Sequence, residues 1–92
     1  MEKKVINTQK APAAIGPYSQ AIQFGNLLFI SGQLPINPET GDLLEGDIKE
    51  QTRQCMKNIK AICEEAGATL DDIVKTTIFV KDLNLFGDIN EA

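Results

Sequence analysis

The stretch that decides the fold is Ala21-Ile22-Gln23-Phe24-Gly25-Asn26-Leu27-Leu28-Phe29-Ile30. Two apolar runs of strand length stand on either side of a Gly-Asn pair, and a two-residue connection of this composition is typical of a tight primed turn. The stretch therefore predicts a β-hairpin. Because its second run is apolar at every position, we expect that strand to be covered on both faces, by this chain or by a partner.

A turn follows the hairpin at Asn37-Pro38-Glu39-Thr40-Gly41. Proline at the second position of the turn fixes φ, and glycine suits a left-handed residue at the exit. Residues 34–36 and 42–44 can therefore pair across this turn as two short strands.

A long amphipathic helix is predicted over residues 48–66. Asp47 with Glu50 three residues later resembles a capping box, and Gly67 stands where a helix typically stops. One stripe of side chains recurs at steps of three and four residues and is predicted to face a core. This stripe consists of Ile48, Thr52, Cys55, Ile59, Ile62, Cys63 and Ala66.

The remaining segments complete an α+β pattern. Residues 4–7 predict a short edge strand, residues 69–72 a single capped turn, and residues 73–80, which are rich in β-branched side chains, a further strand. Residues 83–92 predict the opening of a second helix. The side chains of that helix expected to face the core are Leu85, Phe86 and Ile89.

These elements predict one domain with antiparallel strands and with helices on one face of the sheet. The uncovered face of such a sheet needs a partner, which favours an oligomer. No helix-stop signal closes the last segment, so residues 1–92 are predicted to form a single domain that is incomplete at its C-terminus.

The charge and composition of the chain limit its function. Among 92 residues there are nine Lys and Arg against thirteen Asp and Glu, so the net charge is −4. This acidic balance disfavours binding to nucleic acid. Histidine is absent, which removes the usual Ser-His and Cys-His nucleophile pairs and most zinc chemistry. Without a secretory signal or an apolar run long enough for a bilayer, the sequence predicts a cytoplasmic protein with no membrane partner.

Two polar, glycine-bearing segments flank the hairpin and predict a small-molecule pocket: Ala14-Ile15-Gly16-Pro17-Tyr18-Ser19-Gln20-Ala21 and Ile30-Ser31-Gly32-Gln33-Leu34-Pro35. Tyr18 either offers a hydroxyl to a pocket or packs its ring onto the sheet, and from its segment alone packing is favoured. Gly32 either lets a ligand approach the backbone or marks a β-bulge, and the two interpretations are compatible. Ser31 has neither a base nor a G-x-S-x-G elbow, so it is not predicted to be a nucleophile.

Other residues with reactive side chains are predicted to be structural or solvated. Glu64-Glu65 and Asp71-Asp72 are adjacent carboxylates, and consecutive residues on a helix point in different directions, so we expect both pairs at the surface. Cys55 and Cys63 lie on the apolar stripe, about 12 Å apart along the helix axis, which is too far for a disulfide. They are predicted to be buried core thiols.

The segment Ala11-Pro12-Ala13-Ala14-Ile15-Gly16-Pro17-Tyr18-Ser19-Gln20-Ala21 resembles the N-terminal signature of the Rid/YjgF family. Members of that family are reactive-intermediate deaminases, also described as L-PSP endoribonucleases or translation inhibitors. The resemblance covers nearly the whole chain. It continues through Ser31-Gly32-Gln33-Leu34-Pro35, the turn at residues 37–41, Gln51-Thr52-Arg53-Gln54, Asn58-Ile59-Lys60-Ala61-Ile62 and residues 72–83.

The resemblance implies a chorismate-mutase-like (YjgF-like) α+β fold with an antiparallel or mixed sheet, assembled as a homotrimer with a pocket at each subunit interface. It implies hydrolysis of reactive enamines and imines (2-aminoacrylate, 2-iminobutanoate and 2-iminopropanoate) to 2-keto acids and ammonia, without a metal or organic cofactor. The imine carbon is already electrophilic, so the protein has mainly to orient the substrate and position a water. The substrate-binding residues implied by the resemblance are Tyr18, Ser31, Gly32, Phe86 and Asn90.

The resemblance also implies that part of the site lies outside residues 1–92. In the family pattern an arginine for the substrate carboxylate, a pocket cysteine and a glutamate for water activation all fall beyond Ala92, and Arg53 on the helix does not match that arginine. A bidentate arginine clamp is hard to replace, so the 92-residue form is expected to have little deaminase activity and to trimerise poorly. Two alternatives stay open: an RNA-cleaving or translation-inhibiting protein, and a non-catalytic module that binds small metabolites.

Overall fold

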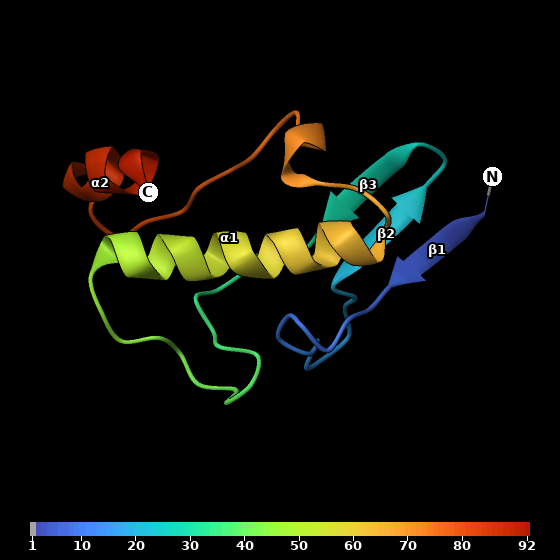
Figure 1. The fold of residues 1–92 in the computed structure, drawn as a ribbon, viewed down its shortest axis with the longest axis horizontal. Coiled ribbons are helices and arrows are strands. Elements are labelled where there is room, and N and C mark those ends of the chain that lie inside the picture. The colour runs from blue at the N-terminus through green and yellow to red at the C-terminus, as the bar shows by residue number, and fades with distance from the viewer. Residues whose placement is uncertain (1) are drawn as a thin grey trace.

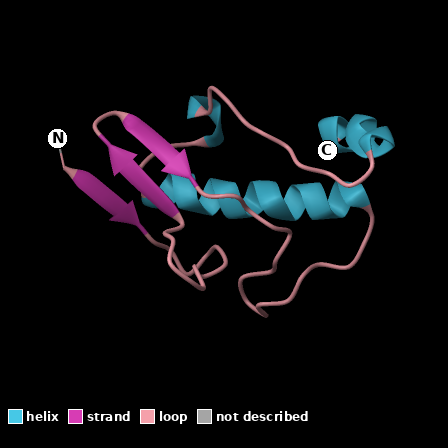
Figure 2. Ribbon diagram, turned by 180° about the vertical axis from the view of Figure 1, so that it is seen from behind, coloured by secondary structure: helices cyan, strands magenta, loops and turns pink. Residues whose placement is uncertain are grey.

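The structure is a computed structural model that describes residues 2–92. Its sheet contains three antiparallel strands in the order β1-β2-β3, namely β1 (Lys3–Ile6), β2 (Ala21–Phe24) and β3 (Leu27–Ile30) (Figure 1). The long helix α1 (Ile48–Glu65) follows the strands in the chain and crosses one face of the sheet. The helix lies in front of the strands in Figure 1 and behind them in Figure 2. The predicted α+β class is confirmed.

The predicted hairpin forms with the predicted turn. Ala21 pairs with Ile30 and Phe24 with Leu27, which leaves Gly25 and Asn26 as a two-residue connection. Gly25 has φ +62°, whereas Asn26 keeps a negative φ. A positive φ at the first turn position alone is the type II′ pattern, whose twist matches that of the flanking strands.

Helix α1 ends one residue earlier than predicted, and both of its ends are capped. The side chain of Asp47 accepts a hydrogen bond of 2.8 Å from the backbone N–H of Glu50, which satisfies one of the free donors of the first turn. At the other end Gly67 takes φ +82°, and the N–H of Ala68 returns to the carbonyl of Cys63 at 2.8 Å. This is a Schellman-type stop.

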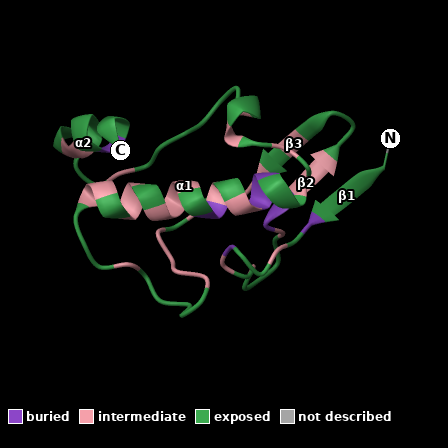
Figure 3. Ribbon diagram, viewed as in Figure 1, coloured by how far each residue is buried: buried purple, intermediate pink, exposed green. Residues whose placement is uncertain are grey.

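The core lies where the C-terminal half of α1 meets the sheet and the N-terminal loop. Figure 3 shows the buried residues gathered at that end of the helix. Ile62 is fully buried and packs with the buried Ile6, Ala11 and Ala21. The predicted apolar stripe is confirmed, because none of its members is exposed while Lys57, Lys60 and Glu64 on the other side are.

The opposite face of the sheet carries no covering element within residues 2–92. Side chains alternate between the faces of a sheet, and the register places five apolar residues together on this side. We call this set the outer sheet face; its members are Val5, Ile22, Phe24, Leu27 and Phe29. The last strand is predicted to be covered on both faces, by this chain or by a partner. Leu27 and Phe29 are 55% and 60% exposed, so residues 2–92 cover only one face of this strand.

Two predicted strand pairings are corrected by the structure. Residues 73–80 do not form a strand, because no described segment lies alongside to share a hydrogen-bond ladder; their β-branched residues favour extended backbone, but a strand also needs a partner. Val74 and Phe79 on this segment are 95% and 93% exposed. Across the turn at residues 37–41, the predicted pair of strands is reduced to a single bridge between Ile36 and Leu43.

The last segments are short and local. A 3-10 turn, η1 (Leu70–Asp72), confirms the predicted capped turn and is followed later by η2 (Leu83–Leu85) and the helix α2 (Phe86–Glu91). Helix α2 packs against α1, with Ile89 buried, but Phe86 is 51% exposed and does not face the core as predicted. Within residues 2–92 no helix has the length and apolarity needed to cross a membrane.

Candidate functional site

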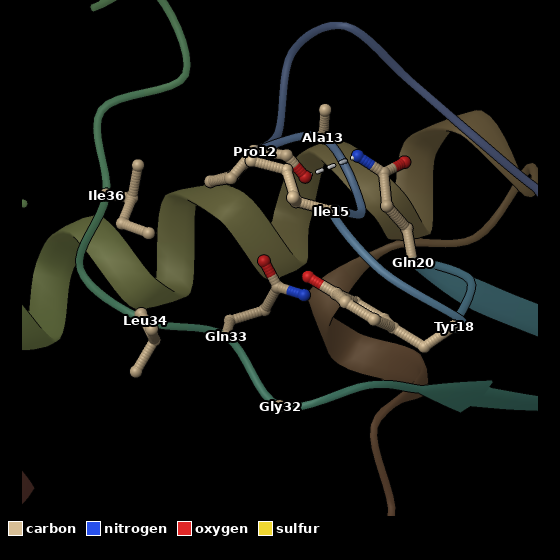
Figure 4. A pocket seen from close by; sticks show the side chains of 9 residues that line it. All are labelled: Pro12, Ala13, Ile15, Tyr18, Gln20, Gly32, Gln33, Leu34 and Ile36. Carbon is tan, nitrogen blue, oxygen red and sulfur yellow. Dashed lines mark hydrogen bonds between the residues drawn. The ribbon is translucent and has the colours of Figure 1, made fainter. Parts of the chain in front are cut away.

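A cavity of about 230 Å³ lies between the loop before β2 and the segment after β3. Figure 4 shows that side chains from both segments point into it. The residues that line the cavity are Pro12, Ala13, Ile15, Tyr18, Gln20, Gly32, Gln33, Leu34 and Ile36. The two segments predicted to flank a pocket are thus brought together by the hairpin between them.

Each wall of the cavity contains a tight turn centred on proline. The N–H of Tyr18 donates to the carbonyl of Gly16 at 2.9 Å across Pro17, and the N–H of Ile36 donates to the carbonyl of Leu34 at 2.7 Å across Pro35. A hydrogen bond between residues two apart defines a γ-turn, and the fixed φ of proline suits the inverse form. These two γ-turns fix the backbone at Tyr18, Leu34 and Ile36, although none of the three residues lies in a helix or strand.

Gln20 is 2% exposed and anchors the first wall. Its Nε2 donates to the carbonyls of Thr8, Ala11 and Pro12 at 3.0, 3.3 and 2.8 Å, and its Oε1 accepts from the N–H of Thr8 at 2.7 Å. A loop has no ladder of its own to satisfy its backbone groups, so one buried amide fulfils that role here.

Asn58 on α1 anchors the second wall. It is fully buried, and its Nδ2 donates to the carbonyls of Leu34 and Ile36 at 3.2 and 3.0 Å. Its Oδ1 accepts from Nε2 of Gln54 at 2.9 Å. One turn earlier on the helix, the thiol of Cys55 contacts the carbonyl of Gln33 at 3.4 Å. Three carbonyls of the segment after β3 therefore face α1.

The cavity lining is mostly apolar and includes the polar side chains of Tyr18, Gln20 and Gln33. None of its lining residues is an Asp, Glu, Lys or Arg. Tyr18 is 52% exposed, and its hydroxyl and the amide of Gln33 both project into the space between the walls (Figure 4). Nε2 of Gln33 also donates to the carbonyl of Ser31 at 3.2 Å. Such a lining can orient a small ligand by hydrogen bonds, whereas a ligand anion needs a cation from another source.

The structure brings only some of the sequence-predicted site residues together. Tyr18 and Gly32 line the cavity. Ser31 is next to it, but its hydroxyl donates to the carbonyl of Ser19 at 2.6 Å, so the side chain joins the two segments. Phe86 and Asn90 lie on α2 and are not among the residues that line the cavity in one copy of the chain. Their part in substrate binding stays a prediction.

Sequence reasoning missed Gln20 and Asn58 as the residues that shape the cavity. Both are polar, and neither position belongs to a motif with an evident chemical role. The available signal was positional: Asn58 lies between Cys55 and Ile62, four residues from the second and three from the first, on the stripe that faces the core. A buried amide at such a position must find hydrogen-bond partners, and the only free ones are in loops.

Cys63 is buried as predicted, whereas Cys55 is only partly buried and that prediction is corrected; the two carboxylate pairs lie at the surface as predicted. Burial raises the pKa of the Cys55 thiol. Burial, with the nearby charges of Asp72 and Glu64, raises the pKa of Cys63. Both thiols are free and protonated at neutral pH, so neither is an activated nucleophile. The carboxylates of the two acidic pairs are exposed, and the described residues contain no cluster of three or more metal-ligating side chains.

Comparison with known proteins shows the family and the fold of this chain. The family model described as Endoribonuclease L-PSP matches residues 8–92. A RutC family protein of Pyrococcus abyssi is 62% identical over 92 residues, which is 100% of this chain and 72% of the relative. A 2-iminobutanoate/2-iminopropanoate deaminase of Escherichia coli strain K12 is 54% identical over 87 residues, or 95% of this chain and 67% of the relative.

Solved structures that resemble this chain belong to the same family as these relatives. A protein of the Rid family from Yersinia pestis superimposes with a TM-score of 0.95 at 58% identity, covering 98% of this chain and 71% of that one. The chain belongs to the Rid family, also known by the names YjgF and Endoribonuclease L-PSP. The YjgF-like fold expected from the sequence is confirmed.

Proposed function

We propose that this protein hydrolyses reactive enamine and imine intermediates, such as 2-aminoacrylate, 2-iminobutanoate and 2-iminopropanoate, to 2-keto acids and ammonia. The observation that carries the proposal is the cavity without acidic or basic side chains at the open end of the hairpin, which Tyr18 lines from before β2 and Gly32 from after β3. The deaminase of Escherichia coli at 54% identity supports the choice of reaction.

The cavity offers what this reaction needs from a protein without histidine. Water adds across the carbon–nitrogen double bond to give a carbinolamine, with its hydroxyl on carbon and its second proton on nitrogen. The hydroxyl proton then passes to the nitrogen, the carbon–nitrogen bond breaks to release ammonia, and the carbonyl of the 2-keto acid forms. The Tyr18 hydroxyl and the Gln33 amide can hold a planar substrate, and Gly32 lets it approach the backbone, because a Cβ built there meets no atom within 4 Å. Orientation of substrate and water accounts for most of the rate gain in such a site.

The substrate carboxylate needs a positive charge that the cavity lining does not contain. Arg53 is exposed on α1 and does not line the cavity. We propose that the arginine expected beyond residue 92 supplies this charge, and that residues 1–92 alone bind the neutral part of the substrate. The 92-residue form should therefore bind 2-keto acids weakly and turn over imines slowly.

The test measures both the binding of a 2-keto acid and the turnover of an imine by the 92-residue chain. Freshly generated 2-iminobutanoate should release ammonia slightly faster with the protein than without it, and 2-ketobutanoate should shift the NMR signals of the Tyr18 and Gly32 amides. Tyr18→Phe and Gly32→Ala should weaken both effects while the chain stays folded. Thr76→Val is the matched control, because it removes an exposed hydroxyl far along the chain from the cavity.

Two outcomes would overturn the proposal. If the wild-type chain neither binds 2-ketobutanoate nor raises ammonia release, the cavity is not a site for this substrate class. If the chain cleaves RNA and Tyr18→Phe abolishes the cleavage, the ribonuclease alternative replaces the deaminase. Normal deaminase turnover by the 92-residue chain would instead refute the role given to the additional arginine.

We also propose that copies of the chain associate as a homotrimer through the outer sheet face, weakly in the 92-residue form. Five apolar side chains across three strands form this face, and Val5, Phe24, Leu27 and Phe29 on it are 41–60% exposed. A continuous apolar surface of this kind marks an interaction site.

Phe29→Glu should abolish concentration-dependent association in sedimentation equilibrium, whereas Val74→Glu, at a more exposed position outside the sheet, should leave it intact. A wild-type chain that stays monomeric at every concentration contradicts the proposal.

A further inference from the structure

The wall formed by residues 33–36 is held by α1 and not by the sheet. Beyond β3 the chain has no strand partner until the single bridge at Ile36. The carbonyls of Leu34 and Ile36 both accept from Nδ2 of Asn58, and the carbonyl of Gln33 faces the thiol of Cys55. The helix therefore sets the position of this wall through side-chain contacts.

Asn58 is the strongest of these contacts. It is fully buried, each of its amide protons has a backbone acceptor, and Gln54 fixes the opposite end of its amide. A buried amide satisfied at both ends allows one orientation only, since any rotation leaves a polar group unpaired. The two carbonyls held by Asn58 belong to Leu34 and Ile36, whose side chains line the cavity.

We propose that Asn58 is a positioning residue that sets the width of the cavity and thereby the size of the substrate side chain that the protein accepts. With the carbonyls of Leu34 and Ile36 drawn toward α1, their aliphatic side chains form the apolar part of the lining opposite Tyr18. Without Asn58, the wall loses its two hydrogen bonds to the side chain of a helix residue and keeps the weaker Cys55 thiol contact, the γ-turn at Pro35, the bridge at Ile36 and the hydrogen bond of 2.7 Å from the Leu44 N–H to the Pro35 carbonyl. This inference rests on the proposed function, because it concerns selection among 2-keto or 2-imino acids.

The test measures the affinity of the 92-residue chain for two ligands and the hydrogen exchange of one backbone amide. The dissociation constants of 2-ketobutanoate and of the longer 2-ketohexanoate are measured by NMR titration for wild type and Asn58→Ala. We expect the ratio of the two constants to change at least fivefold, with the longer acid gaining relative to the shorter. Hydrogen exchange of the Leu44 amide should become at least tenfold faster.

Cys63→Ala is the matched control, because Cys63 is buried on the same helix and has no hydrogen bond to the wall. It should lower stability without changing the ratio of the two constants. If Asn58→Ala does not fold, Gln54→Ala decides, since it removes only the bond that orients the Asn58 amide; a smaller change in the same direction is expected. An unchanged ratio in the folded variant overturns the inference.

The outcomes separate this inference from the function on which it rests. If the wild-type chain binds neither acid, the proposed function fails, and the selection of side-chain size fails with it. If the wild type binds but the variant keeps the wild-type ratio and the wild-type exchange at Leu44, the function stands and the role of Asn58 is refuted.

Discussion

Residues 3–68 and residues 73–92 are held in the fold in different ways. The first region contains all the largest fully buried side chains, Ile62, Gln20 and Asn58, and its loops are tied to helix and sheet by buried amides. The second region contains no β-strand and therefore has no inter-strand hydrogen bonds. It exposes Val74 and Phe79 and buries only Ile89. Figure 3 shows this contrast along the chain. Extended or helical backbone can therefore form locally, whereas a defined cavity needs fixed long-range contacts.

The largest expected effect comes from a test of this contrast that removes one apolar side chain from each region. Ile62→Ala should lower the free energy of unfolding by about 3 kcal/mol, because it leaves a cavity at a fully buried position. Phe79→Ala should change it by less than about 0.5 kcal/mol, since that ring is 93% exposed. Urea denaturation followed by circular dichroism measures both. Equal losses would show that residues 73–92 are packed as firmly as the core.

A second test replaces Gln20, which immediately precedes β2, and Gln23, which lies on that strand. Gln20→Leu should cost about 2 kcal/mol, because it leaves the N–H of Thr8 and several loop carbonyls without partners. Gln23→Leu should cost far less, since its one side-chain bond, to the carbonyl of Gly25, is exposed and 3.4 Å long. Denaturation of both variants gives the difference. Similar costs would mean that the Gln20 network does not hold the loop.

Much of the fold followed from local pattern. The hairpin could be predicted because Gly25-Asn26 specifies a turn, and α1 because its cap, stripe and stop all agree. Residues 73–80 could not be predicted correctly, because composition favours extended backbone but does not reveal whether a neighbouring strand is present. Where the evidence was within ten or twenty residues, sequence reasoning succeeded; where it depended on distant pairing, it did not.

The candidate site was predicted only in outline. Tyr18 and Gly32 could be placed at a pocket because polar glycine-bearing segments on either side of a hairpin must end near each other. Gln20 and Asn58 could not, since their partners are backbone carbonyls 8–24 residues away that no motif marks. The substrate-binding role implied for Ser31 stays a prediction; its hydroxyl donates to the carbonyl of Ser19 and so joins two loop segments.

A third and smaller effect concerns pH and the buried thiol of Cys63, near the end of α1 in the first region. Burial raises the pKa of Cys63 above its ordinary value of 9.0, with the charges of Asp72 and Glu64 adding to the effect. A raised pKa in the folded state means that this thiol's contribution to stability is complete below about pH 9 and is lost as the pH rises through the folded-state value. Denaturation between pH 7 and pH 11 should show a shallower alkaline loss for Cys63→Ala than for wild type. Identical slopes would mean that the thiol ionises as freely in the folded state as in the unfolded one.

The smallest expected effect is at the only salt bridge found among residues 2–92, which joins the two regions. Nζ of Lys49 on α1 lies 3.1 Å from Oε2 of Glu91 on α2, and both side chains are partly exposed. Such pairs contribute about 0.5 kcal/mol or less and are screened by salt. Lys49→Met should therefore leave global unfolding nearly unchanged but speed hydrogen exchange of the α2 amides by about twofold at low salt, with the difference vanishing at high salt. Lys60→Met, an exposed lysine farther along the same helix, should change neither. If Lys49→Met instead lowers global stability by as much as Gln20→Leu, residues 73–92 belong to the same cooperative unit as the cavity, and the contrast between the two regions is wrong.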